Sequence, residues 1–280
     1  MELGKINTLK ILRETDIAYL LTDGEEEIFL HKKEAKRPYL DDEEIDVFLY
    51  VDNQGRPTAS TQEPLIQLGE VKLLEVVEIG KRYGAFLYYG MIKDLLISYD
   101  DLPTTFSKWP QIGDKVFVKM ITKGEKLFGH IVGRKQITDE FPNRIPLVDN
   151  ETVKAYVMYL LDNGMVAYSE AGDEIFIHSN NYRDEYRIGE FVEPKILKLN
   201  PSGEYVGTLI EQKEVMLEED ALRILEYLED NDRKMVLTDK SSPELIYKTF
   251  HMSKSAFKRA LGALYRAKKV ELNKNKTIKL

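Results

Sequence analysis

The sequence contains no cysteine, and it also lacks long apolar runs and a leader-like start. Without cysteine the chain has no disulfide, no catalytic thiol and no thiolate zinc site, and a reducing cytoplasm is the expected location. The first residues carry charge early and lack the apolar core of a signal peptide. The longest apolar runs, such as Ala155 to Leu161, are too short to span a bilayer, so we expect no membrane association.

Motifs that carry catalysis are missing as well. The sequence has no Gly-x-Ser-x-Gly, no phosphate-binding loop, no Gly-x-Gly-x-x-Gly after a strand and no His-Glu-x-x-His. Two acidic runs, Gly24 to Glu27 and Asp41 to Glu44, lie in turn-like stretches and are expected to be solvated loops rather than Mg²⁺ sites. We therefore expect a protein that is not an enzyme and that needs neither a cofactor nor a metal.

Charge is present in four alternating segments. The formal net charge of −8 argues against a protein coated in nucleic acid. Residues 1–64 and 139–217 carry net charges of −7 and −8, whereas residues 65–138 and 218–280 carry +3 and +4. A polyanionic partner is therefore expected to prefer the second and fourth segments.

A short pattern occurs three times before the last segment. It consists of an acid, three apolar residues and a small polar residue or histidine, and its copies are Glu27–His31, Asp94–Ser98 and Glu174–His178. Each copy follows a strand-like run with a turn and precedes a polar loop with another strand. About five short strands per repeat are typical of a small antiparallel barrel. The sequence predicts three related barrels over residues 1–64, 65–138 and 139–217.

One stretch of the second repeat combines glycine, aromatic and basic residues. Gly84 allows the backbone to bend where a side chain would clash. Tyr83 and Phe86 flank this glycine, and Lys81 and Arg82 come just before it. Exposed aromatic rings beside positive charge can stack bases and hold phosphates. The alternative is that the same residues form ordinary barrel wall.

The second repeat resembles the S1 domain, the RNA-binding OB-fold of ribosomal protein S1. The segments that carry the resemblance are Gly69–Val71, Tyr83–Leu87, Leu95–Ser98 and Gly113–Val116. In that family an aromatic-Gly-Ala-Phe segment, a histidine or serine that ends the third strand, and a late Asp and Arg line the RNA face. The resemblance implies RNA contacts from Tyr83, Phe86 and Ser98, and from Lys126 in place of the arginine. Trp109, before a proline, is expected to pack over the end of the barrel.

The first and third repeats match the S1 pattern less fully. In the first repeat a tyrosine is matched to Phe86, a histidine ends the third strand, and an Asp-x-x-Gly-Arg element follows. The RNA contacts that this implies are Tyr19, His31 and Arg56, although a histidine with a purely structural role is the alternative for His31. The third repeat keeps Gly164 and His178 but loses both aromatics, and we expect a degenerate unit that serves structure or a protein contact.

The last segment changes to helical periodicity. Leu225 and Leu228 belong to the apolar stripe of a first helix. Ser242 and Pro243 suit the start of a second helix, and Ser253 suits the cap of a third. Two short alternating strands follow, so the sequence predicts a winged helix over residues 218–280. The basic side chains expected to contact nucleic acid are Lys254, Lys258, Arg259, Arg266, Lys274 and Lys276.

Tandem S1-like units that end in a winged helix resemble the conserved virulence factor B (CvfB) family of Firmicutes. The order of modules and the segments Ser242–Tyr247 and Ser253–Tyr265 carry this resemblance. It implies a mainly β protein with some α-helix, built from three S1-like OB-fold barrels and a winged helix. It also implies an RNA-binding, post-transcriptional regulator of gene expression with single-stranded RNA as its partner. A DNA-binding transcription regulator and a protein-interaction scaffold stay open as alternatives.

Overall fold

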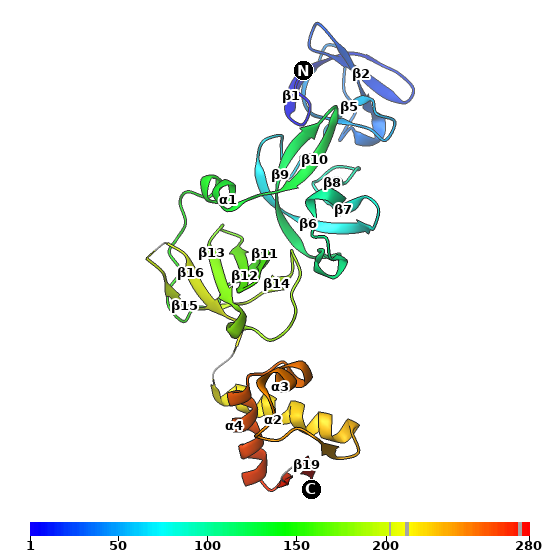
Figure 1. Ribbon diagram of the computed structural model, residues 1–280. Coiled ribbons are helices and arrows are strands. Elements are labelled where there is room, and N and C mark those ends of the chain that lie inside the picture. The colour runs from blue at the N-terminus through cyan, green and yellow to red at the C-terminus, as the bar shows by residue number, and fades with distance from the viewer. Residues whose placement is uncertain (202, 211–212, 274–275) are drawn as a thin grey trace. The chain divides into compact units, whose positions relative to one another are not determined.

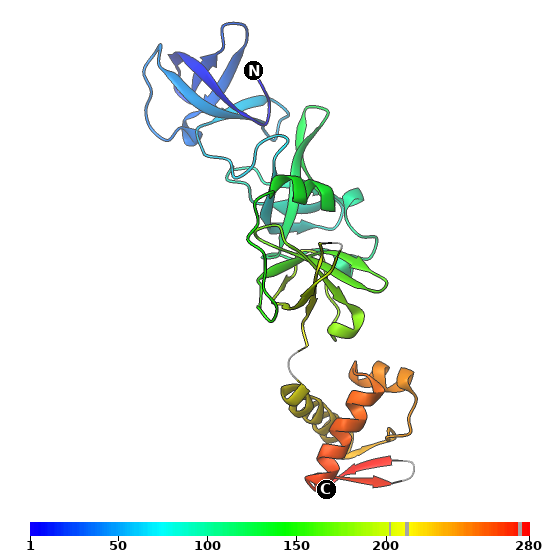
Figure 2. The ribbon, with the colours of Figure 1, turned by 90° about the vertical axis from the view of Figure 1, so that its left-hand side faces the viewer.

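Most of the regular secondary structure of this protein is β-strand, and helices predominate only near its C-terminal end, as the computed structural model shows (Figures 1 and 2). The structure describes residues 1–201, 203–210, 213–273 and 276–280. The chain divides into two compact units, the first made of Met1–Phe176 and Tyr186–Tyr205 and the second of Ile177–Glu185 and Val206–Leu280. The predicted fold class, barrel-like sheets followed by a winged helix, is confirmed. None of the described helices has the length and apolar character needed to cross a membrane.

The first repeat folds as a closed five-stranded barrel. Its strands are β1 (Ile6–Glu14), β2 (Ala18–Thr22), β3 (Glu27–His31), β4 (Glu44–Val51) and β5 (Pro57–Ser60), and they close in the order β1-β2-β3-β5-β4. A short 3₁₀ turn, η1 (Lys32–Glu34), follows β3. In β3 the apolar residues Ile28 and Leu30 are buried while Phe29 between them is exposed, because successive side chains of a strand point to opposite faces.

The second repeat forms a closed barrel with the same topology. Its strands are β6 (Val71–Gly80), β7 (Gly84–Leu87), β8 (Leu95–Ser98), β9 (Lys115–Lys123) and β10 (Lys126–Ile131), in the order β10-β8-β7-β6-β9. Two 3₁₀ turns, η2 (Tyr99–Asp101) and η3 (Phe106–Lys108), lie between β8 and β9. The expected role of Gly84 is confirmed: its φ is +132°, and a Cβ there would lie 1.9 Å from the Ile97 carbonyl oxygen. Only glycine fits this conformation and this close approach.

The third repeat forms a six-stranded sheet after a short helix, α1 (Arg134–Glu140). Its strands are β11 (Ala155–Leu161), β12 (Gly164–Ser169), β13 (Glu174–His178), β14 (Phe191–Val192), β15 (Lys195–Leu199) and β16 (Tyr205–Thr208), with the 3₁₀ turn η4 (Ser179–Asn181) after β13. The order across the sheet is β14-β11-β12-β13-β16-β15. Val166 in β12 is 5% exposed. The third repeat therefore has a small, buried residue at the position that Phe86 occupies in the second repeat.

Within the first compact unit, the second repeat shares one apolar core with both of its neighbours. This core includes Phe48 of the first repeat, Phe117 of the second and Tyr168 of the third. The rings of Phe117 and Tyr168 lie 6.3 Å apart, edge to face. Arg187 adds a bidentate ion pair, in which Nε and Nη2 donate to the Asp114 carboxylate at 2.8 and 2.9 Å. The repeats of this unit are thus packed together.

The C-terminal segment has the helices and the hairpin of a winged helix. Its elements are α2 (Lys213–Asp230), β17 (Lys234–Met235), α3 (Pro243–Phe250), α4 (Lys254–Arg266), β18 (Val270–Asn273) and β19 (Lys276–Lys279). The predicted caps are confirmed, because Ser242 Oγ accepts from Leu245 N at 3.3 Å and Ser253 Oγ from Ala256 N at 3.2 Å. The three short strands pair in the order β17-β19-β18.

Candidate functional site

Three apolar side chains lie side by side on the outer face of the second barrel. Phe86 of β7 is opposite Leu96 of β8, and Leu96 is paired in turn with Phe128 of β10. All three are partly buried, whereas their strand neighbours Leu87 and Leu95 are almost completely buried inside the barrel. The alternation of strand side chains therefore places one apolar stripe across three strands on the outside.

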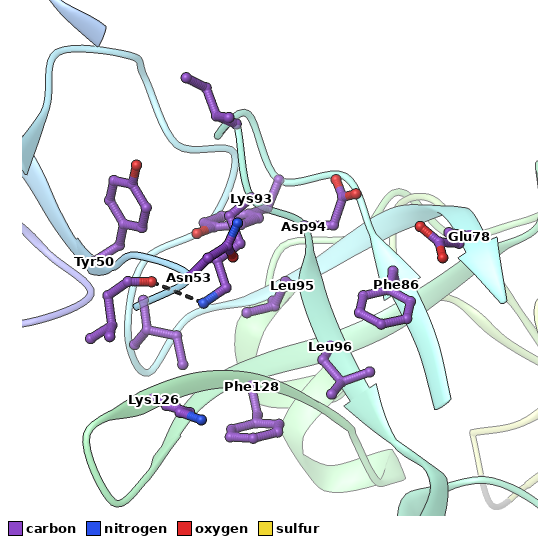
Figure 3. A pocket seen from close by; sticks show the side chains of 14 residues that line it. Tyr50, Asn53, Glu78, Phe86, Lys93, Asp94, Leu95, Leu96, Lys126 and Phe128 are labelled. Atoms are coloured by element: carbon purple, nitrogen blue, oxygen red, sulfur yellow. Dashed lines mark hydrogen bonds between the residues drawn. The ribbon is translucent and has the colours of Figure 1, made fainter. Parts of the chain in front are cut away.

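This stripe lines a hollow of about 470 Å³, which Figure 3 shows from close by. The lining also includes polar side chains, among them Glu78, Asp94 and the exposed Lys126. A hollow of this size, with two rings and a few polar groups, can hold a flat aromatic ligand such as a base. The hollow also has a wall from the first barrel, formed by Tyr50, Val51 and Asn53.

Positive charge accompanies the stripe on β9 and β10. Lys123 Nζ lies 5.5 Å from the ring centre of Phe128 and 3.1 Å from a carboxylate oxygen of Asp101. His130 Nδ1 lies 3.5 Å from the same oxygen of Asp101. The ammonium group of Lys123 is attracted to the ring face. Because Asp101 offsets the charge of Lys123, the exposed Lys126 of the hollow offers the stronger contact for a phosphate.

Two acidic side chains accompany Lys126 in the lining of the hollow. Burial raises the pKa of Asp94, and the nearby charge of Glu78 raises it further. Both acids line the hollow with Phe86. Since like charges repel, this part of the hollow favours an uncharged base over a phosphate.

The aromatic pair predicted from the sequence is split between two places. Phe86 lines the hollow, but Tyr83, which is 65% exposed, lies before β7 and is not one of the lining residues. Ser98 is paired with Gly84 and is partly buried, on the same strand as Leu96. Tyr83, Phe86 and Ser98 stay predicted contacts, and the geometry places Phe86 in the hollow.

The two basic residues before Tyr83 are exposed, and one of them contacts an aromatic cluster. Lys81 Nζ lies 5.0 Å from the ring centre of Phe106, which packs on Trp109 at 5.1 Å. Trp109 is only 3% exposed, and its Nε1 donates to the Pro103 oxygen at 2.6 Å. The predicted packing role of Trp109 agrees with this burial. Lys81 and Arg82 remain accessible to a ligand.

The predicted surface position of Tyr19 is wrong. Tyr19 is 3% exposed and packs edge to face on Tyr39, with their ring centres 5.6 Å apart. The register of β2 with β3 pairs Leu20 with Phe29, as β7 with β8 pairs Phe86 with Leu96. Leu20 is thus the counterpart of Phe86. A shift of one residue moves a strand side chain to the opposite face, so Tyr19 points into the core.

The other two predicted contacts of the first barrel are exposed at its surface. His31 Nδ1 accepts from Lys33 N at 3.1 Å and so caps η1, which gives it a structural role as well. The Arg56 guanidinium donates twice to Oδ2 of Asp52, at 2.7 and 2.9 Å. The same carboxylate accepts from the backbone of Gln54 and Arg56, so the Asp-x-x-Gly-Arg element forms a closed turn.

The basic side chains of the winged helix are mostly exposed. Lys258, Arg259 and Arg266 on α4 and Lys276 on β19 are exposed, and Lys254 is partly buried. Within the described part of the chain, none of these five cations pairs with a carboxylate. Lys274 lies outside the described residues. Among the residues described, no group of three or more His, Cys, Asp or Glu could hold a metal ion.

Sequence reasoning missed two residues of the stripe and one of its cations. These are Leu96, Phe128 and Lys123. Period-two alternation in β8 would have placed Leu96 on the outer face, because Leu95 and Ile97 are buried on either side of it. The parallel pairing of β10 with β8 brings Phe128 beside Leu96, and nothing in the local sequence encodes it.

The fold and this face define a class of protein, namely tandem S1-type barrels joined to a winged helix. Family models match in three places: an S1 domain at residues 3–62, a CvfB first S1-like domain at residues 72–130, and a CvfB-like winged helix domain at residues 222–280. These matches cover two of the three repeats and the C-terminal segment.

Full-length relatives then identify the family. The chain is 34% identical to YitL of Bacillus subtilis over 271 residues, which is 96% of this chain and 91% of the relative. It is 30% identical to conserved virulence factor B of Staphylococcus aureus over 282 residues, or 98% of this chain and 92% of the relative. The chain belongs to the CvfB family.

A solved structure resembles the whole chain in fold. A multidomain protein with nucleic acid binding domains from Streptococcus pneumoniae matches 99% of this chain and 98% of its own, with a TM-score of 0.66 and 26% identity. The match extends the likeness in fold to the whole chain.

Proposed function

We propose that this chain binds single-stranded RNA through the outer face of its second barrel and acts as a cytoplasmic, non-enzymatic regulator of gene expression after transcription. The observation that carries the proposal is the stripe of Phe86, Leu96 and Phe128 beside Lys123 and Lys126. Bases stack on such rings while lysines hold the phosphates, and neither contact depends strongly on base identity. The structurally similar protein from Streptococcus pneumoniae, which has nucleic acid binding domains, supports nucleic acid as the ligand class.

The winged helix supplies a second basic site in this proposal. Lys258 and Arg259 on α4 are exposed and have no carboxylate partner in the described residues. Two weak sites on one chain raise the apparent affinity when both reach the same strand. Binding is therefore expected to be sensitive to salt and tolerant of sequence.

Filter binding of single-stranded RNA to the full chain tests the first site. Phe86→Ala/Phe128→Ala removes both rings from the hollow, and we expect at least about 25-fold weaker binding, because each stacked base contributes roughly 1–3 kcal/mol. Phe191→Ala removes an exposed ring from β14 and is the matched control. Tyr83→Ala measures the contribution of the ring outside the hollow. Unchanged binding by the double variant would show that the rings of the hollow do not stack bases.

The second site is tested by charge removal. Lys258→Ala/Arg259→Ala is expected to reduce the salt dependence of RNA binding, since each lost phosphate contact lowers the slope by about one. Lys195→Ala/Lys198→Ala removes two charges from β15 and is the control. The same slope for both double variants would argue against a second site on α4.

The exposed cations of α4 also favour one alternative, a DNA-binding transcription regulator. In that case duplex DNA binds as tightly as single-stranded RNA. Its binding is then lost with Lys258→Ala/Arg259→Ala and unaffected by Phe86→Ala/Phe128→Ala. A protein-interaction scaffold, favoured by the acidic first and third repeats, would bind neither nucleic acid at physiological salt.

A further inference from the structure

The first barrel supplies part of the hollow on the second barrel. The residues that it contributes are Tyr50, Val51 and Asn53 (Figure 3). Lys93 of the second barrel holds this wall in place, because its Nζ donates to the backbone oxygens of Val51 at 3.0 Å and Asp52 at 3.3 Å. A charged donor bonded to two carbonyls of the neighbouring barrel is a specific attachment.

A second hollow of about 550 Å³ lies beside the turn between β4 and β5. It is on the outer face of the first barrel, and its lining includes Ile17, Phe29, His31, Tyr50, Asp52 and Arg56. Tyr50 lines both hollows, so they are neighbours separated by the β4–β5 turn. Phe29 is 57% exposed and therefore available to a ligand.

The two hollows occupy equivalent faces of the two barrels. Phe29 of β3 pairs with Thr58 of β5 in parallel, as Leu96 of β8 pairs with Phe128 of β10. Arg56, two residues before Thr58, thus stands where Lys126 stands in the second barrel. A ligand that suits one face has a matching surface on the other.

The distance between the two faces is fixed by packing. Phe48 of the first barrel meets Tyr89, which follows β7, with ring centres 6.2 Å apart. A backbone bond between the repeats adds to this contact, because Leu68 N donates to Gly4 O at 2.7 Å. The hollows are therefore presented to one ligand at a constant separation.

We propose that both hollows form one track, in which a single strand bound to the second barrel crosses the β4–β5 turn and stacks a base on Phe29. This inference rests on the proposed function and adds the first barrel to the site. Glu27 and Glu34 also line the second hollow, so it accepts bases rather than phosphates. Arg56 is paired with Asp52, so stacking rather than net charge supplies the added affinity.

Length dependence tests the track. Fluorescence anisotropy with the full chain would use oligouridylates of about 4 to 16 nucleotides, the range of site sizes of single OB folds. The parent chain is expected to bind the longest strands more tightly than the shortest. Phe29→Ala is expected to weaken binding of the long strands about 5- to 150-fold and to leave the shortest unchanged, because short strands fill only the second hollow.

Matched variants separate this effect from misfolding. Leu40→Ala removes another exposed apolar side chain of the first barrel, outside both hollows, and should not change either affinity. Phe29→Trp keeps a stacking surface and should retain binding of the long strands. If Phe29→Ala weakens long and short strands equally, or weakens neither, the track is wrong while the proposed function stands. If the parent chain binds RNA of no length, both are wrong.

Discussion

The first two barrels share one topology and differ on their outer faces. Both close through a parallel pair, β3 with β5 and β8 with β10. Across equivalent strands the second barrel has Phe86, Leu96 and Phe128, all partly exposed, whereas the first has the buried Leu20 with Phe29 and Thr58. The strand order is thus kept while the number of rings on the face changes from two to one.

The difference extends to the interior of the barrels. Ala85 follows Gly84 inside the second barrel, and Tyr19 follows Ala18 at the equivalent positions of the first. The second barrel therefore has a small residue inside and an aromatic residue, Phe86, on its outer face. The first barrel has its aromatic residue, Tyr19, inside. An aromatic residue in a repeat therefore reveals a binding face only after the register of its strand is known.

The largest expected effect concerns Gly84 of the second barrel, where the first barrel has Ala18. Gly84→Ala should destabilise the protein by more than about 4 kcal/mol, because the new Cβ would meet the Ile97 carbonyl oxygen at a positive φ. Gly24→Ala, at a φ of +100° with nothing within 4 Å of a Cβ, is the control for backbone strain alone. Denaturant unfolding measures both. Equal costs at the two glycines would mean that the barrel relaxes around the side chain.

Alanine substitutions of Tyr19 and Phe86 should affect stability and RNA binding in opposite ways. Tyr19→Ala removes a buried ring, and we expect a loss of about 3–5 kcal/mol of stability with little direct effect on RNA contacts. Phe86→Ala should cost less stability and weaken RNA binding. Unfolding curves and RNA affinities of both variants decide the matter. A stable Tyr19→Ala variant with weak RNA binding would instead place Tyr19 on the ligand face.

A buried acid distinguishes the first barrel as well. The Tyr50 hydroxyl donates to Oε1 of Glu34, a carboxylate whose Oε2 accepts no hydrogen bond from the described residues. Tyr50→Phe removes that donor and is expected to cost about 1–3 kcal/mol in unfolding experiments. Ile121→Val in β9, at the equivalent position of the second barrel, is the milder control. No loss on Tyr50→Phe would mean that water replaces the hydroxyl.

The same tyrosine should make stability depend on alkaline pH. Burial raises the pKa of Tyr50, and its hydrogen bond to Glu34 raises it further. Burial, together with the nearby charge of Glu174, raises the pKa of Tyr159 to about 12. Because the folded values exceed the unfolded value of about 10, stability is full below pH 10 and falls as the pH rises above it. Thermal unfolding from pH 8 to 11 measures the loss, and Tyr50→Phe should reduce it.

The smallest expected effect concerns acidic pH at the hollow of the second barrel. Asp94 takes up a proton at a higher pH than an ordinary aspartate, because burial and Glu78 raise its pKa. RNA binding should therefore tighten about two- to fivefold as the pH falls through that pKa, since one repulsive charge disappears. Asp94→Asn should bind like the parent at low pH and show less change with pH. An unaltered pH profile would assign the effect to other groups.

Part of this site was predictable from the sequence. The repeat pattern placed Phe86 on β7, the fit of glycine at 84 followed from its neighbours, and Ser242 and Ser253 were recognisable as caps. The match of Tyr19 to Phe86 was wrong, because it aligned one aromatic residue with another and ignored the pairing of β2 with β3, in which His31 lies opposite Ala18. That register would have put Leu20 at the position.

By itself the sequence determined the local features of this protein: the modules, their order, the strand periodicity and the helix caps, because neighbouring residues encode these. Only the tertiary structure decided which side chains form the site. Phe128 lies beside Leu96 through a parallel pairing, and Lys93 bonds to carbonyls 41 and 42 residues away. Such contacts depend on how strands and barrels pack, and no local pattern specifies the partner of a side chain so distant along the chain.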